Sequence, residues 1–217
     1  MTEHKPYGPY EKYIKRPQDF ICALLAIIVL SPVLLVVAIL VRANLGAPVF
    51  FTQERPGKDG KIFKLYKFRS MLPPKKGEDD PKYDASRLTP FGRKLRATSL
   101  DELPELFNIL KGDMSVVGPR PLLVQYLSRY NEHQARRYEV RPGFTGLAQV
   151  NGRNTLSWEA KFDEDVSYVD HITFLGDWKI IFTTVKTVIM KEGINCDDSV
   201  TMTEFMGSEV PVNVGSK

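Results

Sequence analysis

Residues 20–41 read FICALLAIIVLSPVLLVVAILV and carry no formal charge over 22 consecutive positions. A helix rises about 1.5 Å per residue, so a straight helix of this length can cross the roughly 30 Å hydrocarbon layer of a bilayer. A cleaved secretory signal has a shorter apolar region followed by small residues at a cleavage site, and a buried core helix shows a polar face. Neither description fits this segment, which is therefore predicted to insert into a membrane.

A serine-proline pair, Ser31-Pro32, stands at the middle of this segment. Proline lacks a backbone N–H and kinks a helix, and the two arms of about eleven and nine residues each reach only about half of the hydrocarbon thickness. Basic residues, which favour the cytoplasmic side, flank both ends of the segment. They are Lys12, Lys15 and Arg16 before it and Arg42 after it. The pattern predicts a re-entrant helix-break-helix, with an ordinary single span as the alternative.

The composition of the 217-residue chain, 43% hydrophobic and 26% charged, is that of one ordinary domain with appendages. Two cysteines, Cys22 and Cys196, indicate no disulfide framework and a reducing compartment. The three histidines lack partners at zinc-ligand spacing, so a zinc site is not expected.

Charge is unevenly distributed along the chain. Residues 61–96 carry eleven Lys or Arg against four Asp or Glu, whereas residues 154–217 carry five against eleven. A basic block in a chain with a net charge of +4 indicates an anionic partner, such as phosphates, nucleic acid or a lipid surface. From charge alone, a solvated basic face explains the block equally well.

Beyond the apolar segment, hydrophobic periodicity and turn residues predict a small hairpin followed mostly by helices. The predicted strands are 48–54 and 61–69, joined by a Pro-Gly-rich turn, and residues 72–86 form a surface loop. Predicted helices start at Thr89-Pro90, span about 102–111 with Gly112 as the stop, span 122–138, and form an amphipathic stretch over 174–191. The last of these packs on the core or lies among lipid headgroups, and the existing membrane tether favours the headgroups.

The acidic pair Asp101-Glu102 lies at the start of the predicted helix near 102–111. A carboxylate in a first turn is stabilised by free backbone N–H groups and the helix dipole, which keeps it ionised, and the same helix end attracts phosphate. Acidic residues favour this position in any protein, so the pair alone is explained by helix capping.

Basic residues in or beside the neighbouring turns change that interpretation, because they can converge on the same helix end. They are Lys67, Arg69, Arg96, Arg120 and Arg141. Arginine suits bidentate phosphate contacts, and a ring of cations lets anions approach an acidic nucleophile. A carboxylate that attacks a diphosphate forms an acyl phosphate, and a second carboxylate can hold Mg²⁺ together with substrate phosphates. The constellation predicts phosphoryl-transfer chemistry.

Two glycine-proline elements, GPRP at 118–121 and RPGFTG at 141–146, carry two of these arginines. They would present the arginines on rigid backbone, with Gly143 and Gly146 permitting close approach of a ligand. Further along, Asp163 and Asp165 are either helix-surface charges or assist the metal or the sugar, and the sequence leaves both roles open.

These motifs together resemble a known family, the bacterial sugar transferases or small monotopic phosphoglycosyl transferases. The matching stretches, in chain order, are KRPQDFICALLAIIVLSP (15–32), FTQERPGKDGKIFKLYKFRSM (51–71), TPFGRKLRATSLDELPELFNILKGDMSVVGPRP (89–121) and RPGFTGLAQVNGR (141–153), extended by YVD (168–170). The resemblance covers about residues 15–190 and leaves the first fourteen residues and the tail beyond about 192 outside.

The resemblance implies a two-step reaction. Asp101 would attack the sugar-bearing phosphate of a UDP-sugar, expel UMP and become a phosphosugar-aspartyl ester, which polyprenyl (undecaprenyl) phosphate would then attack. Glu102 would hold Mg²⁺, and Arg96 and Arg120 with Lys67 would contact phosphate. The family's re-entrant break would correspond to Ser31-Pro32.

The expected fold class is α+β and mainly helical, with a re-entrant membrane helix, a small β-hairpin and amphipathic helices at the membrane interface. The expected parts are a basic N-terminal segment (1–19), the re-entrant helix (20–41), a cytoplasmic catalytic domain (42–191) and an acidic C-terminal tail (192–217). The implied location is the bacterial inner membrane with the catalytic domain on its cytoplasmic face. The implied partners are a UDP-sugar, polyprenyl phosphate and membrane lipid, without nucleic acid.

Two other functions compete with this one. A membrane-bound nucleotide-sugar pyrophosphatase would use the same diphosphate site and Mg²⁺ with water as the acceptor. A non-catalytic peripheral protein could bind anionic lipid or nucleic acid through the basic block. The second of these does not explain an acidic pair preceded and followed by arginine motifs.

Overall fold

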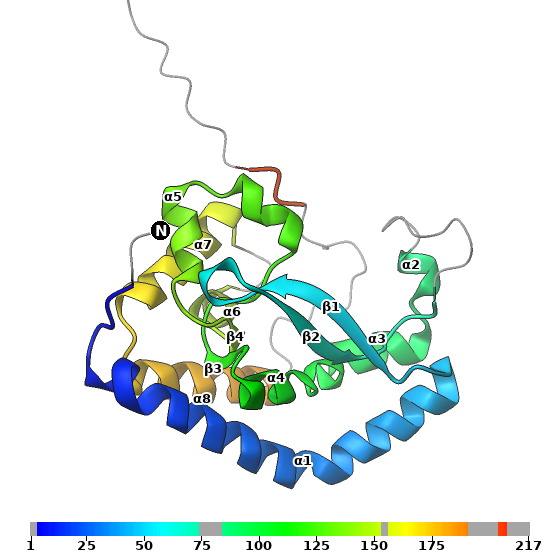
Figure 1. Ribbon diagram of the computed structural model, residues 1–217. Helices are drawn as coiled ribbons and strands as arrows, with labels where there is room; N and C mark the ends of the chain where they lie inside the picture. Colours follow the sequence, from blue (N-terminus) through cyan, green and yellow to red (C-terminus); the bar gives the residue numbers. More distant parts are fainter. Residues whose placement is uncertain (1–3, 74–83, 153–155, 191–203, 208–217) are drawn as a thin grey trace, which may run out of the picture.

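A computed structural model describes residues 4–73, 84–152, 156–190 and 204–207 of the chain (Figure 1). Most of the predicted loop 72–86 lies outside the described residues, apart from its first two residues and the short helix α2 (Asp84–Arg87). Of the predicted tail 192–217, only the segment 204–207 is described.

The apolar segment forms one long helix, α1 (Lys15–Leu45), which continues a π-helical turn, η1 (Tyr10–Ile14). The helix bends near its middle but is not interrupted there (Figure 1), so the predicted break is a bend within a continuous helix. Pro32 has no N–H for the carbonyl of Ile28 four residues earlier. The Ser31 hydroxyl donates to that carbonyl at 2.8 Å instead, which satisfies the acceptor and lets the helix continue.

Both arms of α1 pack against the rest of the domain. The first arm contributes Ala23 to a buried cluster, and the second contributes Val37, Val41 and Leu45 to another. The other members are Leu65, Leu106, Ile109 and Met114 in the first cluster, and Phe68 and Leu95 in the second. The opposite face of α1 is apolar and exposed, with Leu25, Ile28, Val29, Leu35, Val36 and Ile39 each more than half exposed. One side of the helix is thus a core element and the other is an uncovered apolar surface.

The predicted hairpin is confirmed to within two residues at each strand end. Strand β1 (Phe50–Pro56) pairs antiparallel with β2 (Ile62–Phe68), and the turn between them contains a short 3-10 segment, η2 (Lys58–Gly60). The buried amide of Asn108 fastens β2 to the neighbouring helix, because it accepts from the Tyr66 N–H at 3.0 Å and donates to the Lys64 carbonyl at 2.8 Å. This fixes the end of β2 beside the acidic pair.

The helix predicted from Thr89-Pro90 is confirmed as α3 (Pro90–Ala97), with the Thr89 side chain accepting from the Gly92 N–H. The helix predicted over 102–111 begins later than expected. A 3-10 turn, η4 (Leu100–Glu102), comes first, and α4 (Glu105–Lys111) starts after Pro104. Gly112 ends α4 in the left-handed region at φ 93°, as its position predicts.

A short parallel pair of strands, β3 (Ser115–Val117) and β4 (Gly143–Thr145), joins the two glycine-proline elements and was not predicted. Their glycines serve backbone packing. A Cβ on Gly143 would lie 2.0 Å from the Gly118 nitrogen, and one on Gly146 would lie 2.3 Å from the Gly118 oxygen. The predicted ligand approach at Gly143 and Gly146 is therefore wrong, because the backbone of Gly118, directly after β3, occupies that space.

The continuous helix predicted over 122–138 is also wrong. The segment forms three short turns, η5 (Val124–Arg129), α5 (Glu132–Ala135) and η6 (Arg136–Tyr138). Tyr130 adopts an extended conformation, and Asn131 starts a new helix through a reciprocal capping box with Gln134. Local side-chain capping therefore overrides helical periodicity here.

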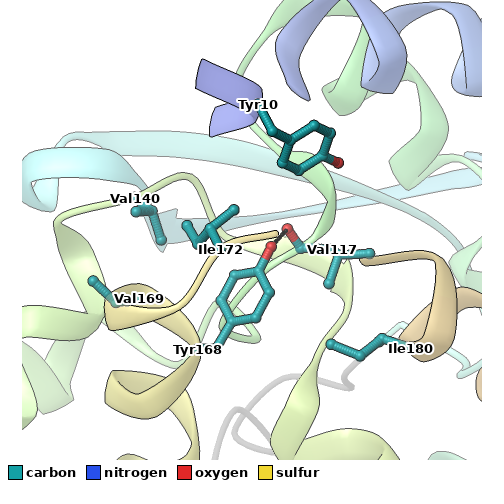
Figure 2. Close-up of a cluster of buried hydrophobic side chains, with 7 residues drawn as sticks. All are labelled: Tyr10, Val117, Val140, Tyr168, Val169, Ile172 and Ile180. Atoms are coloured by element: carbon teal, nitrogen blue, oxygen red, sulfur yellow. Dashed lines mark hydrogen bonds between the residues drawn. The ribbon is translucent and has the colours of Figure 1, made fainter. Parts of the chain in front are cut away.

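The remaining elements are α6 (Leu147–Asn151), α7 (Trp158–Asp170) and α8 (Phe174–Met190), the last confirming the helix predicted over 174–191. A buried cluster joins η1, β3, α7 and α8, and in it the Tyr168 hydroxyl donates to the Val117 carbonyl at 3.0 Å (Figure 2). The outer side of α8 exposes Phe182, Val185 and Val188. Its inner side thus packs on the core, while its outer side is apolar and uncovered.

Candidate active site

Asp101 and Glu102 lie in the tight turn between α3 and α4. The turn begins at Ser99, which has a left-handed backbone (φ 54°), and ends where Pro104 starts α4. This geometry turns Asp101 inward, leaving it only 8% exposed. Consecutive acidic residues in such a turn point in different directions, which allows each a separate role.

Glu102 is held between two of the predicted cations. Lys67, at the end of β2, places its Nζ 2.7 Å from Glu102 Oε1, and the Arg120 guanidinium donates to both Glu102 oxygens. Burial alone would raise the pKa of Glu102, but Arg120 and Lys67 hold that pKa well below its usual range. Glu102 is therefore a permanent carboxylate whose two oxygens face cations.

Asp101 behaves in the opposite way. Burial, and then the charge of Glu102, raise the pKa of Asp101 to about 6, while Lys67 and Arg96 act to lower it. Asp101 is therefore still mostly ionised at neutral pH, as its position predicts, but desolvation outweighs the local backbone and raises its pKa. A carboxylate that is only weakly stabilised as an anion is more basic and hence a better nucleophile.

Glu105 is a third acidic residue of the site, and the prediction missed it. It is 2% exposed, and its Oε1 lies 3.2 Å from Lys67 Nζ. Burial and the charge of Glu102 raise the pKa of Glu105 to about 7. The sequence did contain a signal, since positions 102 and 105 are spaced to share one face of a helical segment.

Arg96 and Arg55 border the acidic pair. Arg96 is anchored by its Nε on the Ser70 hydroxyl at 2.9 Å and lies near enough to Asp101 to lower the pKa of that carboxyl. Arg55, from the end of β1, was not predicted. It donates to the Pro121 carbonyl at 3.2 Å, and burial, then the charge of Arg120, lower its pKa. The site thus gathers cations from the hairpin, from α3 and from the loop after β3.

The other two predicted cations make different contacts. Arg69 is buried and donates to the Leu45 carbonyl at 2.8 Å, at the end of α1. Arg141 donates through Nε to the Gly112 carbonyl at 2.8 Å, at the end of α4 opposite to Asp101. The structure therefore brings Lys67, Arg96 and Arg120 to the acidic pair, whereas Arg69 and Arg141 bind backbone carbonyls elsewhere.

The two aspartates of α7 differ from each other. Asp163 has a 69% exposed side chain and pairs with His133 at 3.0 Å, so it is a surface charge. Asp165 is buried and pairs with the buried Arg137, with 2.7 Å between Oδ2 and Nη2. Arg137 also donates to the Arg120 carbonyl at 2.7 Å, so Asp165 is connected to the site through a basic residue.

Among the residues that the structure describes, no group of three or more His, Cys, Asp or Glu side chains could hold a metal ion by itself. Mg²⁺ commonly binds through one or two carboxylates together with substrate phosphates and keeps several waters. The carboxylate of Glu102 fits that mode, because it offers hard oxygen donors and a diphosphate would supply the other ligands. It does not fit a protein cage that holds the metal before substrate binds.

These residues can act on a diphosphate. The cations attract it and neutralise its charge, the buried Asp101 carboxylate can attack phosphorus, and the close pairing of Glu102 with Lys67 and Arg120 keeps the cations in place.

Comparison with known proteins gives consistent matches. A family model described as bacterial sugar transferase matches residues 10–191. An uncharacterized sugar transferase of Bacillus subtilis, EpsL, is 50% identical over 195 residues, which are 90% of this chain and 96% of that protein. An undecaprenyl-phosphate galactose phosphotransferase of Salmonella typhimurium is 37% identical over 199 residues, and a UDP-glucose:undecaprenyl-phosphate glucose-1-phosphate transferase of Klebsiella pneumoniae is 42% identical over 192 residues. The matches cover 84% and 83% of this chain but only 42% and 41% of these two longer relatives.

Proposed function

The chain belongs to the bacterial sugar transferase family, and from that premise we propose that it transfers a sugar-1-phosphate from a UDP-sugar to a polyprenyl phosphate. The observation that carries this proposal is the buried Asp101 carboxylate beside Glu102, Lys67 and Arg120. A nucleophile flanked by phosphate-binding cations is what phosphosugar transfer needs. The names of the Salmonella and Klebsiella relatives, both acting on undecaprenyl phosphate, support the choice of acceptor.

In the first step, a carboxylate oxygen of Asp101 attacks the phosphorus that carries the sugar. The bond between that phosphorus and the bridging oxygen breaks, UMP leaves with the bridging oxygen, and a phosphosugar-aspartyl ester remains. In the second step, a phosphate oxygen of the polyprenyl phosphate attacks the same phosphorus and releases the Asp101 carboxylate. The products are UMP and a polyprenyl diphosphate-sugar.

Lys67, Arg96 and Arg120 bind the diphosphate and stabilise the charge that builds on it during each attack. Glu102 would hold a magnesium ion that arrives with the donor phosphates. Such an ion supplies Lewis-acid polarisation of the phosphoryl oxygens and neutralises the charge of the departing UMP.

Because the proposed acceptor is a lipid, the active site must lie at a membrane. The described residues contain one helical stretch long and apolar enough to cross a bilayer, Tyr10–Leu45. Because both arms of α1 pack on the same domain, we propose that α1 enters the membrane and returns, with its exposed apolar face and the outer face of α8 against lipid. In this arrangement the catalytic domain lies on the cytoplasmic face of the inner membrane, where basic flanks are favoured.

A product assay tests the proposed reaction. The purified protein with Mg²⁺ and undecaprenyl phosphate is given a panel of UDP-sugars, and UMP and lipid-linked sugar are measured together. With at least one donor, we expect UMP and lipid-linked sugar to form in equal amounts. This turnover should require the lipid phosphate in excess over the enzyme. Continuous release of UMP and free sugar-1-phosphate without the acceptor would instead identify a nucleotide-sugar pyrophosphatase.

The raised pKa of Asp101 predicts how the reaction depends on pH. The carboxylate form is the nucleophile, so activity is lost as pH falls through the pKa of about 6. We expect kcat/KM for the donor to be nearly constant above about pH 7 and to fall about tenfold per unit well below the pKa. Rates measured over roughly pH 5 to 8 check this, and a constant kcat/KM down to about pH 5 would contradict it.

The proposed re-entry of α1 predicts that the chain before the helix and the domain after it both lie in the cytoplasm. In a background with both native cysteines replaced by serine, Tyr13→Cys reports the N-terminal side and Lys94→Cys the catalytic domain, because both positions are exposed. A membrane-impermeant thiol reagent should label neither position in intact cells and both after permeabilisation. Labelling of Tyr13→Cys alone in intact cells would establish a single span.

A matched variant removes the cause of the bend. Replacing Ser31 with Ala and Pro32 with Leu permits a straight helix of spanning length. Part of the population should then expose Tyr13→Cys to the reagent, although the basic flank opposes its export.

A further inference from the structure

The C-terminal segment Glu204–Gly207 lies outside residues 10–191, which match the family model, yet it packs back on the domain. Phe205 is 2% exposed and completes a cluster of aromatic rings. Its ring centroid lies 5.0 Å from that of Phe162 and 5.6 Å from that of Tyr130, on which it stacks. The other neighbouring rings are Tyr126 and Trp158. Four ring neighbours around a buried aromatic side chain hold this segment in a defined position on the domain.

Polar contacts at the edge of the cluster fix the position of this segment. Arg129 donates to the Glu204 carboxylate at 2.8 Å and also to the Phe205 carbonyl. Gln125 donates to the same carboxylate oxygen at 2.7 Å. Because Glu204 is about half exposed, these contacts add little binding energy, and their effect is to set the register that brings Phe205 to the rings.

The same rings enclose Arg137. Its guanidinium carbon lies 5.5 Å from the Phe162 ring centroid and 5.9 Å from that of Tyr130. The Arg137 side chain is only 2% exposed and pairs with Asp165, which is also buried. A buried ion pair depends on close packing, because water that enters beside it weakens the attraction. Phe205 therefore covers the rings that shield this pair.

Arg137 connects the cluster to the catalytic residues. Its Nη2 donates to the Arg120 carbonyl at 2.7 Å, and the Arg120 side chain donates to Glu102. A continuous path of contacts thus runs from Phe205 through the rings to Arg137, then to the backbone of Arg120 and the carboxylate of Glu102.

We propose that Phe205 is a positioning residue of the active site, which holds Arg120 in place for the donor diphosphate through the ring cluster and Arg137. This inference rests on the proposed function, in which Arg120 binds that diphosphate. The C-terminal segment 204–207 would then contribute to activity, although it lies outside residues 10–191, which the family model matches.

The test compares three variants of the full-length chain. Phe205→Ala removes the ring, Phe205→Leu keeps most of the buried volume, and Met206→Ala is the matched control, because Met206 is the next residue and is 75% exposed. We expect Phe205→Ala to lower kcat by about tenfold to a hundredfold at temperatures well below its unfolding midpoint, as a misplaced phosphate ligand does. Phe205→Leu should recover most of the rate, and Met206→Ala should match the wild type.

A double-mutant cycle separates positioning from a general structural role. If Phe205 acts through Arg120, then Phe205→Ala should cost almost nothing further in an Arg120→Ala background. An equal loss in both backgrounds, or a loss in the wild-type background no larger than that of Met206→Ala, would overturn the proposal.

Amide hydrogen exchange gives a readout that does not depend on activity. Exchange in residues 120–138 should be faster in Phe205→Ala than in the wild type and unchanged in Met206→Ala. If the wild type releases no UMP from any donor, the proposed function fails. Even then, faster exchange in Phe205→Ala would establish that segment 204–207 docks on the domain. Unchanged exchange in that variant would refute the docking.

Discussion

Asp101→Asn should abolish turnover while the protein stays folded and membrane-bound. Asparagine has nearly the shape of aspartate but is not a nucleophile for phosphorus, so the covalent route is lost rather than slowed. We expect kcat to fall at least about a thousandfold, as for other enzymes deprived of their nucleophile. Because the buried Asp101 has a raised pKa, its charge is unfavourable to folding, and the neutral variant should be no less stable than the wild type.

Asp163→Asn is the matched control, since Asp163 is an exposed aspartate far along the chain whose removal leaves the site intact. The intermediate can be sought directly by incubating wild type and variant with donor alone and measuring intact mass. The wild type should gain one sugar phosphate on the peptide that contains Asp101, and the variant should gain none. Near-normal turnover of purified Asp101→Asn would exclude the covalent mechanism.

The sequence predicts local elements well where one residue dictates the backbone. Pro32 bends the apolar helix, Thr89 caps α3, and Gly112 ends α4 in the left-handed region that glycine tolerates. The helix predicted over 122–138 fails for the same kind of reason, because the capping box at Asn131 interrupts a pattern that looked continuous. Periodicity alone does not register such a competing hydrogen bond.

The candidate site shows where sequence reasoning stops. Lys67, Arg96 and Arg120 lie beside the acidic pair, as their positions in the sequence predict. Arg69 and Arg141 have the same chemistry and sit in equally suggestive motifs, but they bind carbonyls at helix ends. Which arginine meets a substrate and which caps a helix depends on contacts between segments far apart in the chain.

The pKa of Asp101 depends on burial in the same way. The sequence shows a carboxylate at a helix start, where the dipole lowers a pKa. The structure adds burial to 8% exposure and the adjacent charge of Glu102, which raise it. Burial arises from tertiary packing, so a local sequence pattern does not predict the raised pKa of Asp101.

Glu102→Gln should be the second severe loss and should differ sharply from Glu105→Gln. Both glutamates lie near Lys67, three residues apart along the chain, but of the two it is Glu102 that accepts hydrogen bonds from Arg120. Removing its charge leaves two cations without their shared carboxylate and removes the proposed ligand of Mg²⁺. We expect kcat/KM to fall about a hundredfold to a thousandfold, the cost of losing one preorganised electrostatic contact, together with a higher Mg²⁺ requirement. EDTA should silence the wild type.

Glu105→Gln should lower kcat/KM by less than about threefold, because the raised pKa of Glu105, about 7, leaves about half of it protonated at neutral pH, and an amide imitates that form. The pH profile distinguishes the two variants further. The charge of Glu102 raises the pKa of Asp101, so its removal should move the acid limb of the residual activity of Glu102→Gln to lower pH. Equal losses in the two variants would contradict a separate role for Glu102. An unmoved acid limb in Glu102→Gln would mean that the charge of Glu102 does not raise the pKa of Asp101.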